Sequence, residues 1–220
     1  MAKTEAVGES PARIDEVDLE PYLHPEPIVV VISGTSGAGK DAAIKRLQAR
    51  GCPIHFVVTA TTRPRRPTEV DGVDYIFCQP AEFERLIERG ELLEYARVYG
   101  EYKGIPREQV ERGLASGLDV VLRVDVQGAA RLRELMPEAV FIFLTASSEE
   151  ELIRRLKARK TEAREALQRR LATARAEMRE IVLFAYVVVN PDSQLDRTVN
   201  RILAIMEAEK ARVRPGRARR

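Results

Sequence analysis

One stretch of this 220-residue chain decides its fold: residues 28–47 read IVVVISGTSGAGKDAAIKRL. The first five residues, 28–32, are all β-branched, a pattern typical of a strand buried on both faces of a parallel sheet. A glycine-rich loop follows at 34–40, and apolar residues then recur at helical spacing from Ala43 to Leu47. The loop is therefore predicted to lie between the end of a strand and the start of a helix.

The loop has the spacing G-x-x-x-x-G-K of a phosphate-binding loop (P-loop). Its glycines allow successive backbone N–H groups to surround a phosphate, the helix N-terminus adds positive potential, and the lysine reaches the β- and γ-phosphates. We therefore predict that the loop binds ATP and that its lysine acts in catalysis. The predicted ATP-binding residues of the loop are Gly34, Thr35, Ser36, Gly37, Ala38, Gly39, Lys40 and Asp41.

Asp41 stands where a P-loop ordinarily has Ser or Thr, whose hydroxyl binds Mg²⁺. A carboxylate is also a good Mg²⁺ ligand, but it brings negative charge toward a triphosphate. Two interpretations remain open from the residues alone: Asp41 binds the metal, or a neighbouring cation neutralises it.

A second candidate anion site is formed by the sequence TATTRPRR at 59–66, which has three arginines in four residues. It follows a predicted strand at 55–59, and arginines can hold a phosphate through paired hydrogen bonds. Taken alone, the segment could equally be a solvated basic loop. Next to a P-loop, it suggests that two phosphorylated substrates meet.

Strand and helix patterns alternate through the rest of the chain. Further strands are expected at 120–126, 140–144 and 186–189, and helices at 82–88, 150–179 and 195–206. This alternation predicts an α/β fold with a mostly parallel sheet flanked by helices.

Composition excludes several other classes of protein. Apolar residues make up 45% and charged residues 32% of the chain, so it is neither fibrous nor wholly disordered. The net charge of +2 argues against a dedicated nucleic-acid binder. The longest apolar stretch, 181–189, is far shorter than the ~20 residues that a membrane-crossing helix needs. Cys52 and Cys78 lack metal-site spacing, and we expect free thiols in a reducing compartment.

The two ends of the chain carry opposite charge. Residues 1–27 hold seven acidic and two basic residues with four prolines, which predicts a flexible acidic leader without the features of a targeting signal. Residues 210–220 hold six basic residues and no acidic one. We expect a solvated basic tail there, with contact to RNA or anionic lipid as the alternative.

Several motifs, in order, make the chain resemble the guanylate kinase family over residues 28–209. They are VISGTSGAGK (31–40), TTRPRR (61–66), EVDGVDY (69–75), LLEYA (92–96), GEYKG (100–104), DVQG (125–128) and VVN (188–190). The resemblance implies a P-loop NTPase core, a small GMP-binding lobe at about 59–106 and a helical lid at about 154–172. It further implies phosphoryl transfer from ATP to GMP, and to dGMP, with Mg²⁺.

The resemblance also assigns residues. In the family, a glutamate at the place of Glu94 accepts hydrogen bonds from guanine N1–H and the 2-amino group, which adenine cannot offer. The GMP-binding residues implied are Thr59, Arg63, Arg66, Tyr75, Glu94 and Lys103, the catalytic ones are Lys40, Arg155, Arg159 and Arg170, the metal ligands are Asp41 and Asp125, and Asn190 is a further ATP contact. Without the resemblance, the lid arginines would be interpreted as a solvated helix face.

Several further positions depart from the usual pattern of the family, among them Thr35, which stands where proline is usual. Lys103 replaces a tyrosine at the acceptor phosphate, Ile105 replaces a hydroxyl near the base, and Arg123 stands where an acid is usual. With Asp41, this combination resembles a plant-organelle and related bacterial branch. We hypothesise that Arg123 lies within salt-bridge reach of Asp41 and holds it clear of the ATP phosphates until Mg²⁺ binds.

Two other functions fit parts of the sequence. A ribose 1,5-bisphosphate kinase of related fold also has Asp after the P-loop lysine, but has no use for Glu94. A non-catalytic module that binds phosphopeptides typically loses the ATP loop, which is intact here. We expect a cytoplasmic enzyme, a monomer or weak homodimer, with no nucleic-acid or membrane partner.

Overall fold

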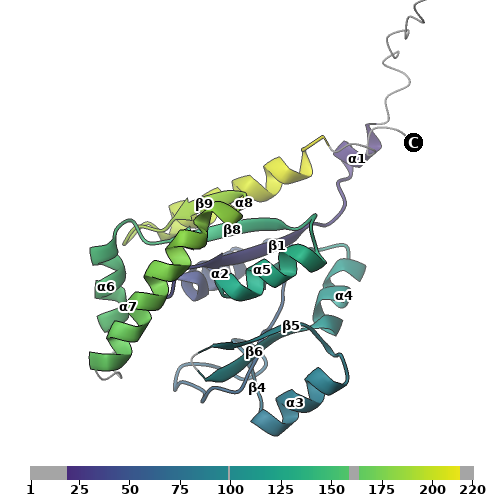
Figure 1. The fold of residues 1–220 in the computed structure, drawn as a ribbon. Coiled ribbons are helices and arrows are strands. Elements are labelled where there is room, and N and C mark those ends of the chain that lie inside the picture. Colours follow the sequence, from purple (N-terminus) through teal and green to yellow (C-terminus); the bar gives the residue numbers. More distant parts are fainter. Residues whose placement is uncertain (1–18, 99, 159–163, 214–220) are drawn as a thin grey trace, which may run out of the picture.

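A sheet of five parallel strands forms the centre of the molecule (Figure 1). The computed structural model describes residues 19–98, 100–158 and 164–213. In spatial order, the strands are β2 (Ile54–Phe56), β7 (Asp119–Arg123), β1 (Val29–Gly34), β8 (Val140–Thr145) and β9 (Tyr186–Val189). The mostly parallel α/β sheet predicted from the sequence is confirmed.

The β-branched run of β1 explains why it occupies the middle of the sheet. Val30 and Ile32 face the core formed with α2 (Lys40–Ala49) and α8 (Leu195–Lys210). Val31 faces the opposite core, which includes α4 (Arg107–Ala115) and α5 (Val126–Leu135). Successive side chains of a strand point to opposite faces, so a strand covered by helices on both sides must be apolar at every position.

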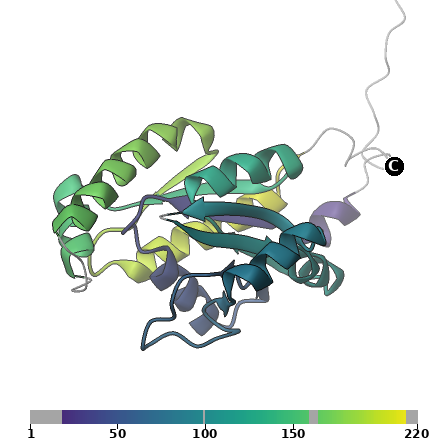
Figure 2. The same cartoon turned by 60° about the horizontal axis from the view of Figure 1, so that its bottom comes forward.

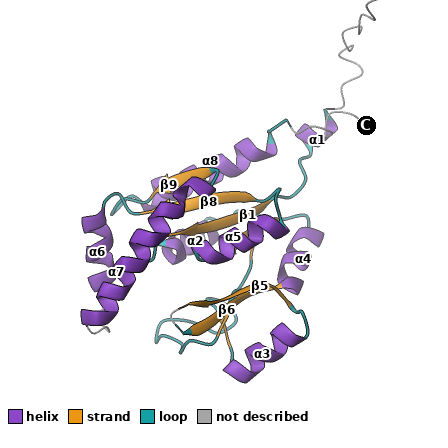
Figure 3. Cartoon of the chain, viewed as in Figure 1, coloured by secondary structure: helices purple, strands orange, loops and turns teal. Residues whose placement is uncertain are grey.

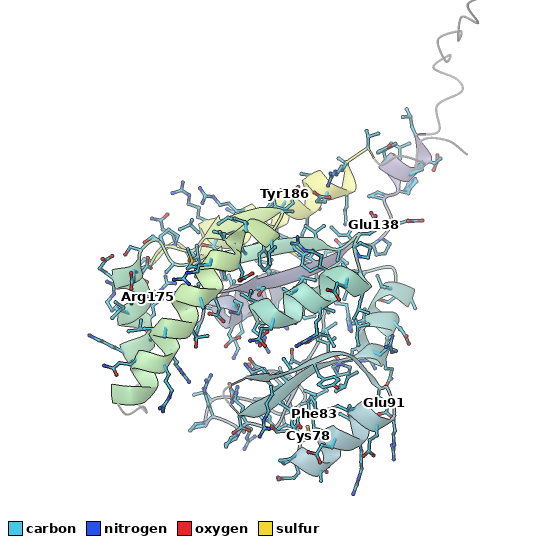
Figure 4. The ribbon with its side chains drawn as sticks, viewed as in Figure 1. Cys78, Phe83, Glu91, Glu138, Arg175 and Tyr186 are labelled. Carbon is cyan, nitrogen blue, oxygen red and sulfur yellow. The ribbon has the colours of Figure 1, made fainter. Side chains whose placement is uncertain are left out.

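A second, four-stranded sheet lies apart from the first (Figure 3). Its order is β4 (Ile76–Phe77), β3 (Ala60–Thr61), β6 (Glu101–Pro106) and β5 (Leu92–Val98). The helix α3 (Pro80–Glu88) packs on it through the buried Phe83, which lies near Cys78 (Figure 4). We call residues 59–106 the small lobe. Figure 2, seen from below, shows its strands in front of the central sheet.

Two helices, α6 (Glu149–Ala158) and α7 (Arg164–Arg179), project from the other end of the central sheet (Figure 1). Leu152, Leu156 and Ala174 pack between them, and Arg175 donates to Glu149 across the pair at 2.7 Å (Figure 4). A short 3₁₀ helix, Glu180–Leu183, follows α7. We call α6 and α7 the lid helices.

The structure corrects the end of one predicted strand, and two other predicted segments lie partly outside the described residues. The strand expected at 120–126 ends at Arg123, because the carboxylate of Asp125 caps α5 by accepting from the Gly128 N–H at 2.8 Å. The helix expected over 150–179 is described as two helices, with 159–163 outside the described residues. Of the expected flexible leader, 1–18 lie outside the described residues, and Glu20–Leu23 form one helical turn, α1.

In the described part of the chain, no helix combines the length and the apolarity that crossing a membrane requires.

Candidate active site

The P-loop joins β1 to α2, as the sequence predicts. Gly34 and Gly39 have φ values of 133° and 91°, which L side chains rarely adopt. A Cβ at Gly34 would also lie 1.9 Å from the Leu144 carbonyl oxygen, so the strand can turn away only at glycine. The Lys40 ammonium donates to the carbonyl oxygens of Gly34 at 2.6 Å and Thr35 at 3.1 Å, which places it over the loop.

Asn190 and Arg155, both predicted for the ATP site, donate hydrogen bonds to the backbone of the P-loop. The Asn190 amide donates to the Ala38 carbonyl at 2.8 Å and accepts from the Thr198 hydroxyl at 2.9 Å. Arg155 donates to the same Ala38 carbonyl at 3.3 Å and to the Asn190 carbonyl at 2.8 Å. Asn190 is buried, so its observed role is to support the P-loop, and its contact with ATP stays a prediction.

The position of Arg155 is itself fixed by carboxylates. Its guanidinium donates to Asp192 at 2.9 Å and to Glu151 at 2.5 Å. Hydrogen bonds from Arg154 and Arg155 lower the pKa of Asp192 well below its usual range. Among the other predicted lid residues, Arg170 lies on α7, and Arg159 lies outside the described residues.

The salt bridge predicted between Arg123 and Asp41 is confirmed. Arg123 Nη1 donates to Asp41 Oδ1 at 2.8 Å, and its Nη2 donates to the Asp74 carbonyl oxygen at 2.8 Å. The guanidinium also lies over the Tyr75 ring, 4.2 Å from its centroid. Arg123 thus joins the start of α2 to a loop of the small lobe. That it keeps Asp41 clear of the phosphates remains a hypothesis.

The two arginines predicted to grip the acceptor phosphate are bound to a carboxylate that the sequence reasoning did not assign. Arg63 donates to both oxygens of Glu69, at 2.8 and 2.5 Å, and the Arg66 backbone N–H donates at 2.9 Å. Burial acts to raise the pKa of Glu69, but the hydrogen bonds and charges of the two arginines outweigh it and lower that pKa. Arg63 also lies over the Tyr75 ring at 4.6 Å, close to the central cavity that Tyr75 lines.

One cavity brings the predicted donor and acceptor residues together. Those of its lining residues that the sequence predicts are Ser36, Lys40, Thr59, Tyr75, Glu94, Lys103 and Asp125. Ile105 and Arg123, noted as departures from the family pattern, line it too. Burial lowers the pKa of both Lys40 and Lys103, while the charge of Asp125 opposes that shift in each case. The cavity therefore presents two ammonium groups beside the Glu94 carboxylate.

Glu94 lies on β5 and is nearly fully buried. Its partner is Arg131 of α5, whose Nε and Nη2 both donate to Oε1, at 2.9 and 2.5 Å. Sequence reasoning did not single out Arg131, because it lies 37 residues from Glu94 and no local spacing links them.

A second missed residue is Glu177 of the lid helix α7. Its carboxylate accepts from the Ser36 backbone N–H at 2.8 Å, so α7 is tied to the P-loop. Burial raises the pKa of Glu177, and the charge of Lys40 opposes that shift. The glutamate sits at helical spacing in a segment rich in charge, where a solvated face is the ordinary interpretation.

Asp41 and Asp125 fit the needs of a divalent cation bound together with a nucleotide. Mg²⁺ is usually held by one or two carboxylates plus substrate phosphates, rather than by a complete protein cage. Accordingly, the residues that the structure describes contain no group of three or more His, Cys, Asp or Glu side chains arranged for a metal. Both carboxylates act on Lys40 electrostatically, and Gly128 occupies only one oxygen of Asp125.

This geometry places a P-loop beside a cavity that residues predicted for the donor and for the acceptor both line, as in a P-loop kinase. A sequence model of the family Guanylate kinase matches residues 26–209, and the chain belongs to the guanylate kinase family. It is thus a nucleoside monophosphate kinase, a class whose fold combines such a core with flanking lobes.

Named relatives agree with the family. "Guanylate kinase 2, chloroplastic/mitochondrial" of Oryza sativa subsp. japonica is 56% identical over 190 residues, which are 86% of this chain and 67% of the relative. The guanylate kinase of Symbiobacterium thermophilum is 48% identical over 195 residues, 88% of this chain and 92% of the relative. The crystal structure of guanylate kinase from Anaplasma phagocytophilum has a TM-score of 0.71 at 31% identity, and the match covers 86% of this chain and 88% of that one.

Proposed function

We propose that this chain catalyses the Mg²⁺-dependent transfer of the ATP γ-phosphoryl group to GMP and dGMP, giving ADP and GDP or dGDP. The observation that carries the proposal is the shared cavity, in which the P-loop lysine Lys40 and the buried carboxylate Glu94 line one space. A donor-side cation and an acceptor for the guanine edge are the two requirements of that reaction.

The proposed role of each residue follows from its position. Lys40 and the N–H groups of the P-loop would bind the ATP phosphates, with Arg155, Arg159 and Arg170 closing on them from the lid. A GMP phosphate oxygen attacks the γ-phosphorus as the bond to the β–γ bridging oxygen breaks, and ADP leaves with that electron pair. Mg²⁺, held by Asp41 and Asp125, would supply neutralisation of phosphate charge.

The acceptor side requires a rearrangement of contacts seen in the structure. Arg63 and Arg66 would exchange Glu69 for the GMP phosphate, which offers more acceptor oxygens in the same region. Lys103 would add a third positive charge, and Tyr75, whose ring lies beneath two guanidinium groups, a hydroxyl. Thr59 and Glu94 would contact the base.

The proposal also covers the lobes, the compartment and the oligomeric state of the enzyme. The separate sheet supports a GMP-binding lobe at about 59–106, and the α6–α7 pair supports a lid at about 154–172. The free thiols of Cys52 and Cys78 support a reducing, cytoplasmic compartment. A monomer or weak homodimer remains our proposal for the oligomeric state.

A coupled assay of ADP formation tests the proposed function. With ATP and Mg²⁺, we expect turnover of GMP and dGMP, and rates for AMP and ribose 1,5-bisphosphate lower by about 10⁴-fold, since a site built for a hydrogen-bonding group rejects analogues lacking it. The Lys40→Ala variant should lose nearly all activity. Turnover of ribose 1,5-bisphosphate in preference to GMP, or retention of activity within tenfold by Lys40→Ala, would overturn the proposal.

A further inference from the structure

The contact between Arg131 and Glu94 uses one oxygen of the carboxylate. Both guanidinium N–H groups, at 2.9 and 2.5 Å, go to the same oxygen, Oε1. Among the residues that the structure describes, none donates a hydrogen bond to Oε2. An Arg–carboxylate pair can also use both oxygens in parallel, as Arg46 of α2 and Asp196 of α8 do in this molecule.

The surroundings of Glu94 leave space for an outside partner. Gly128 faces Oε2, and a Cβ at that position would lie 3.1 Å from the oxygen. Ile105, which pairs with Glu94 across β5 and β6, is apolar and offers neither donor nor acceptor through its side chain. Glu94 also lines the central cavity, whereas Arg131 does not. The arginine therefore approaches the carboxylate from outside the cavity.

The guanine edge makes matching demands. Its N1–H and 2-amino group are two adjacent donors, so they need a carboxylate that is ionised and whose acceptor positions are not all taken. A protonated carboxyl would instead present an O–H donor to them, while adenine N1 could accept from that O–H. The charge state of Glu94 therefore decides which purine it favours.

We propose that Arg131 is a positioning residue for base recognition, which fixes the charge and the orientation of the Glu94 carboxylate and thereby sets the preference for guanine over adenine. This role rests on the proposed GMP kinase function. It extends that function to a residue of α5 that contacts the carboxylate rather than the substrate.

The charges around Glu94 make this role necessary. Burial raises the pKa of Glu94, the hydrogen bonds and the charge of Arg131 lower it, and the charge of Asp125 raises it again. Lys103 lines the same cavity, on the neighbouring strand β6. In the described structure, Arg131 is the one cation that donates hydrogen bonds to this carboxylate. Its removal would leave a buried acid next to a second acid.

The test compares Arg131→Gln with the wild-type enzyme in steady-state kinetics from pH 5.5 to 9. Loss of a charged hydrogen-bond partner should lower kcat/KM for GMP about tenfold or more at neutral pH, with KM for ATP unchanged. The pH below which kcat/KM for GMP falls should move upward by about one unit, since that profile reports an essential base of the free enzyme. For the Arg131→Gln enzyme, kcat/KM for AMP should stay constant or rise as the pH falls.

Matched variants separate positioning from general damage. Arg133→Gln changes a neighbouring arginine of α5 that lies over the Phe141 and Phe184 rings, and it should leave GMP kinetics and the pH profile unchanged. Arg131→Lys keeps the charge and should keep most of the pH profile. If Arg131→Gln does not fold, the neutral variant Arg131→Met is assayed in its place, and calorimetric titration with GMP at pH 6 and 8 measures binding without turnover.

The outcomes are distinct. An Arg131→Gln enzyme that loses GMP and AMP activity in equal proportion, with an unmoved pH profile, has lost only structure, and the inference is wrong. A wild-type enzyme that does not phosphorylate GMP refutes the proposed function instead. An Arg131→Gln enzyme with wild-type kinetics refutes the inference and leaves the proposed function standing.

Discussion

Arg123 shows how one substituted residue can join the two halves of an active site. Its side chain contacts Asp41 at the start of the P-loop helix, the Asp74 carbonyl and the Tyr75 ring of the small lobe. A lone carboxylate after the P-loop lysine would repel a triphosphate. Because the arginine and the acid compensate one another, neither can be interpreted alone, and they should be mutated together.

A double-mutant cycle on Asp41 and Arg123 measures that compensation. Arg123→Gln should raise KM for ATP several-fold, because it releases the Asp41 charge next to the phosphates, and Asp41→Asn added to it should restore much of the loss. The coupling expected for a partly exposed pair is about 0.5–1 kcal/mol. Steady-state kinetics over a range of Mg²⁺ concentrations give the four values.

Lys45→Gln is the matched control for this cycle. Lys45 pairs with Asp74 at 2.6 Å and so contacts the same lobe loop from α2. The Lys45→Gln variant should have nearly the same KM for ATP as the wild type. Additive effects of Asp41→Asn and Arg123→Gln would show that the salt bridge has no functional role.

Sequence reasoning found site residues where local spacing carries the chemistry. Lys40 follows from the loop pattern, and Glu94 from the ordered family motifs. It missed Glu69, Arg131 and Glu177, because each is a charge whose partner is chosen by the tertiary fold. A charged residue on a helix is solvated by default, and only the packing of α5 against β5 brings Arg131 to a buried acid.

At the scale of elements, predictability follows the length of the pattern. The strands of the central sheet are apolar runs that can be recognised in the sequence. By contrast, β3 and β4 have two residues each and cannot show a two-residue period. The predicted strand extends three residues beyond the observed end at Arg123, because Val124 and Val126 continue the apolar alternation. Asp125, which lies between them, already caps α5. A local N-cap outweighed strand propensity there.

The P-loop is the element on which most of the proposed chemistry depends, and Gly39 tests its construction. Gly39→Ala forces a side chain into a left-handed conformation, with its Cβ 2.5 Å from the Asn190 amide nitrogen that supports the loop. Displacing Asn190 would misalign the N–H groups, and we expect affinity for ATP to fall about tenfold or more. Titration with a non-hydrolysable ATP analogue measures the change.

Gly51→Ala provides the comparison. Gly51 ends the same helix with a φ of 64° and has no atom within 4 Å of its would-be Cβ. It should cost about 1 kcal/mol of stability through backbone strain alone, with unchanged nucleotide affinity. Equal effects of the two variants on ATP binding would contradict the proposed role of the Asn190 support.

At the scale of the whole molecule, carboxylate–arginine contacts add polar links between elements. Asp192 connects the lid helix α6 to the segment after β9, and Asp196 connects α8 to α2 through Arg46 and Arg50, at 2.8 and 2.7 Å. Glu69 orders the arginine loop of the small lobe. The pKa of each acid is lowered, that of Asp196 to about 2, by hydrogen bonds from the arginines.

The sign of the resulting pH dependence can be worked out. A carboxyl whose pKa is lower in the folded than in the unfolded state stabilises the fold above its ordinary pKa and loses that contribution as pH falls through the folded value. For Asp196, the window runs from about 4 down to about 2. Glu94 and Glu177, whose pKa values burial raises, act oppositely, so stability rises slightly as pH falls toward their folded values.

We therefore expect the free energy of unfolding to fall as the pH drops from about 4 toward about 2, while Glu94 and Glu177 add stability as they take up protons at higher pH. Urea unfolding followed by circular dichroism at successive pH values measures this curve. Asp196→Asn should lower stability at pH 7 and flatten the acid limb, so that variant and wild type converge below about pH 2, the pKa at which the wild-type carboxyl is half protonated in the folded state. Glu207→Gln, an exposed acid on the same helix, should leave the curve unchanged. A constant difference between Asp196→Asn and wild type down to the lowest pH would show that the aspartate stabilises α2 and α8 by packing rather than by its charge.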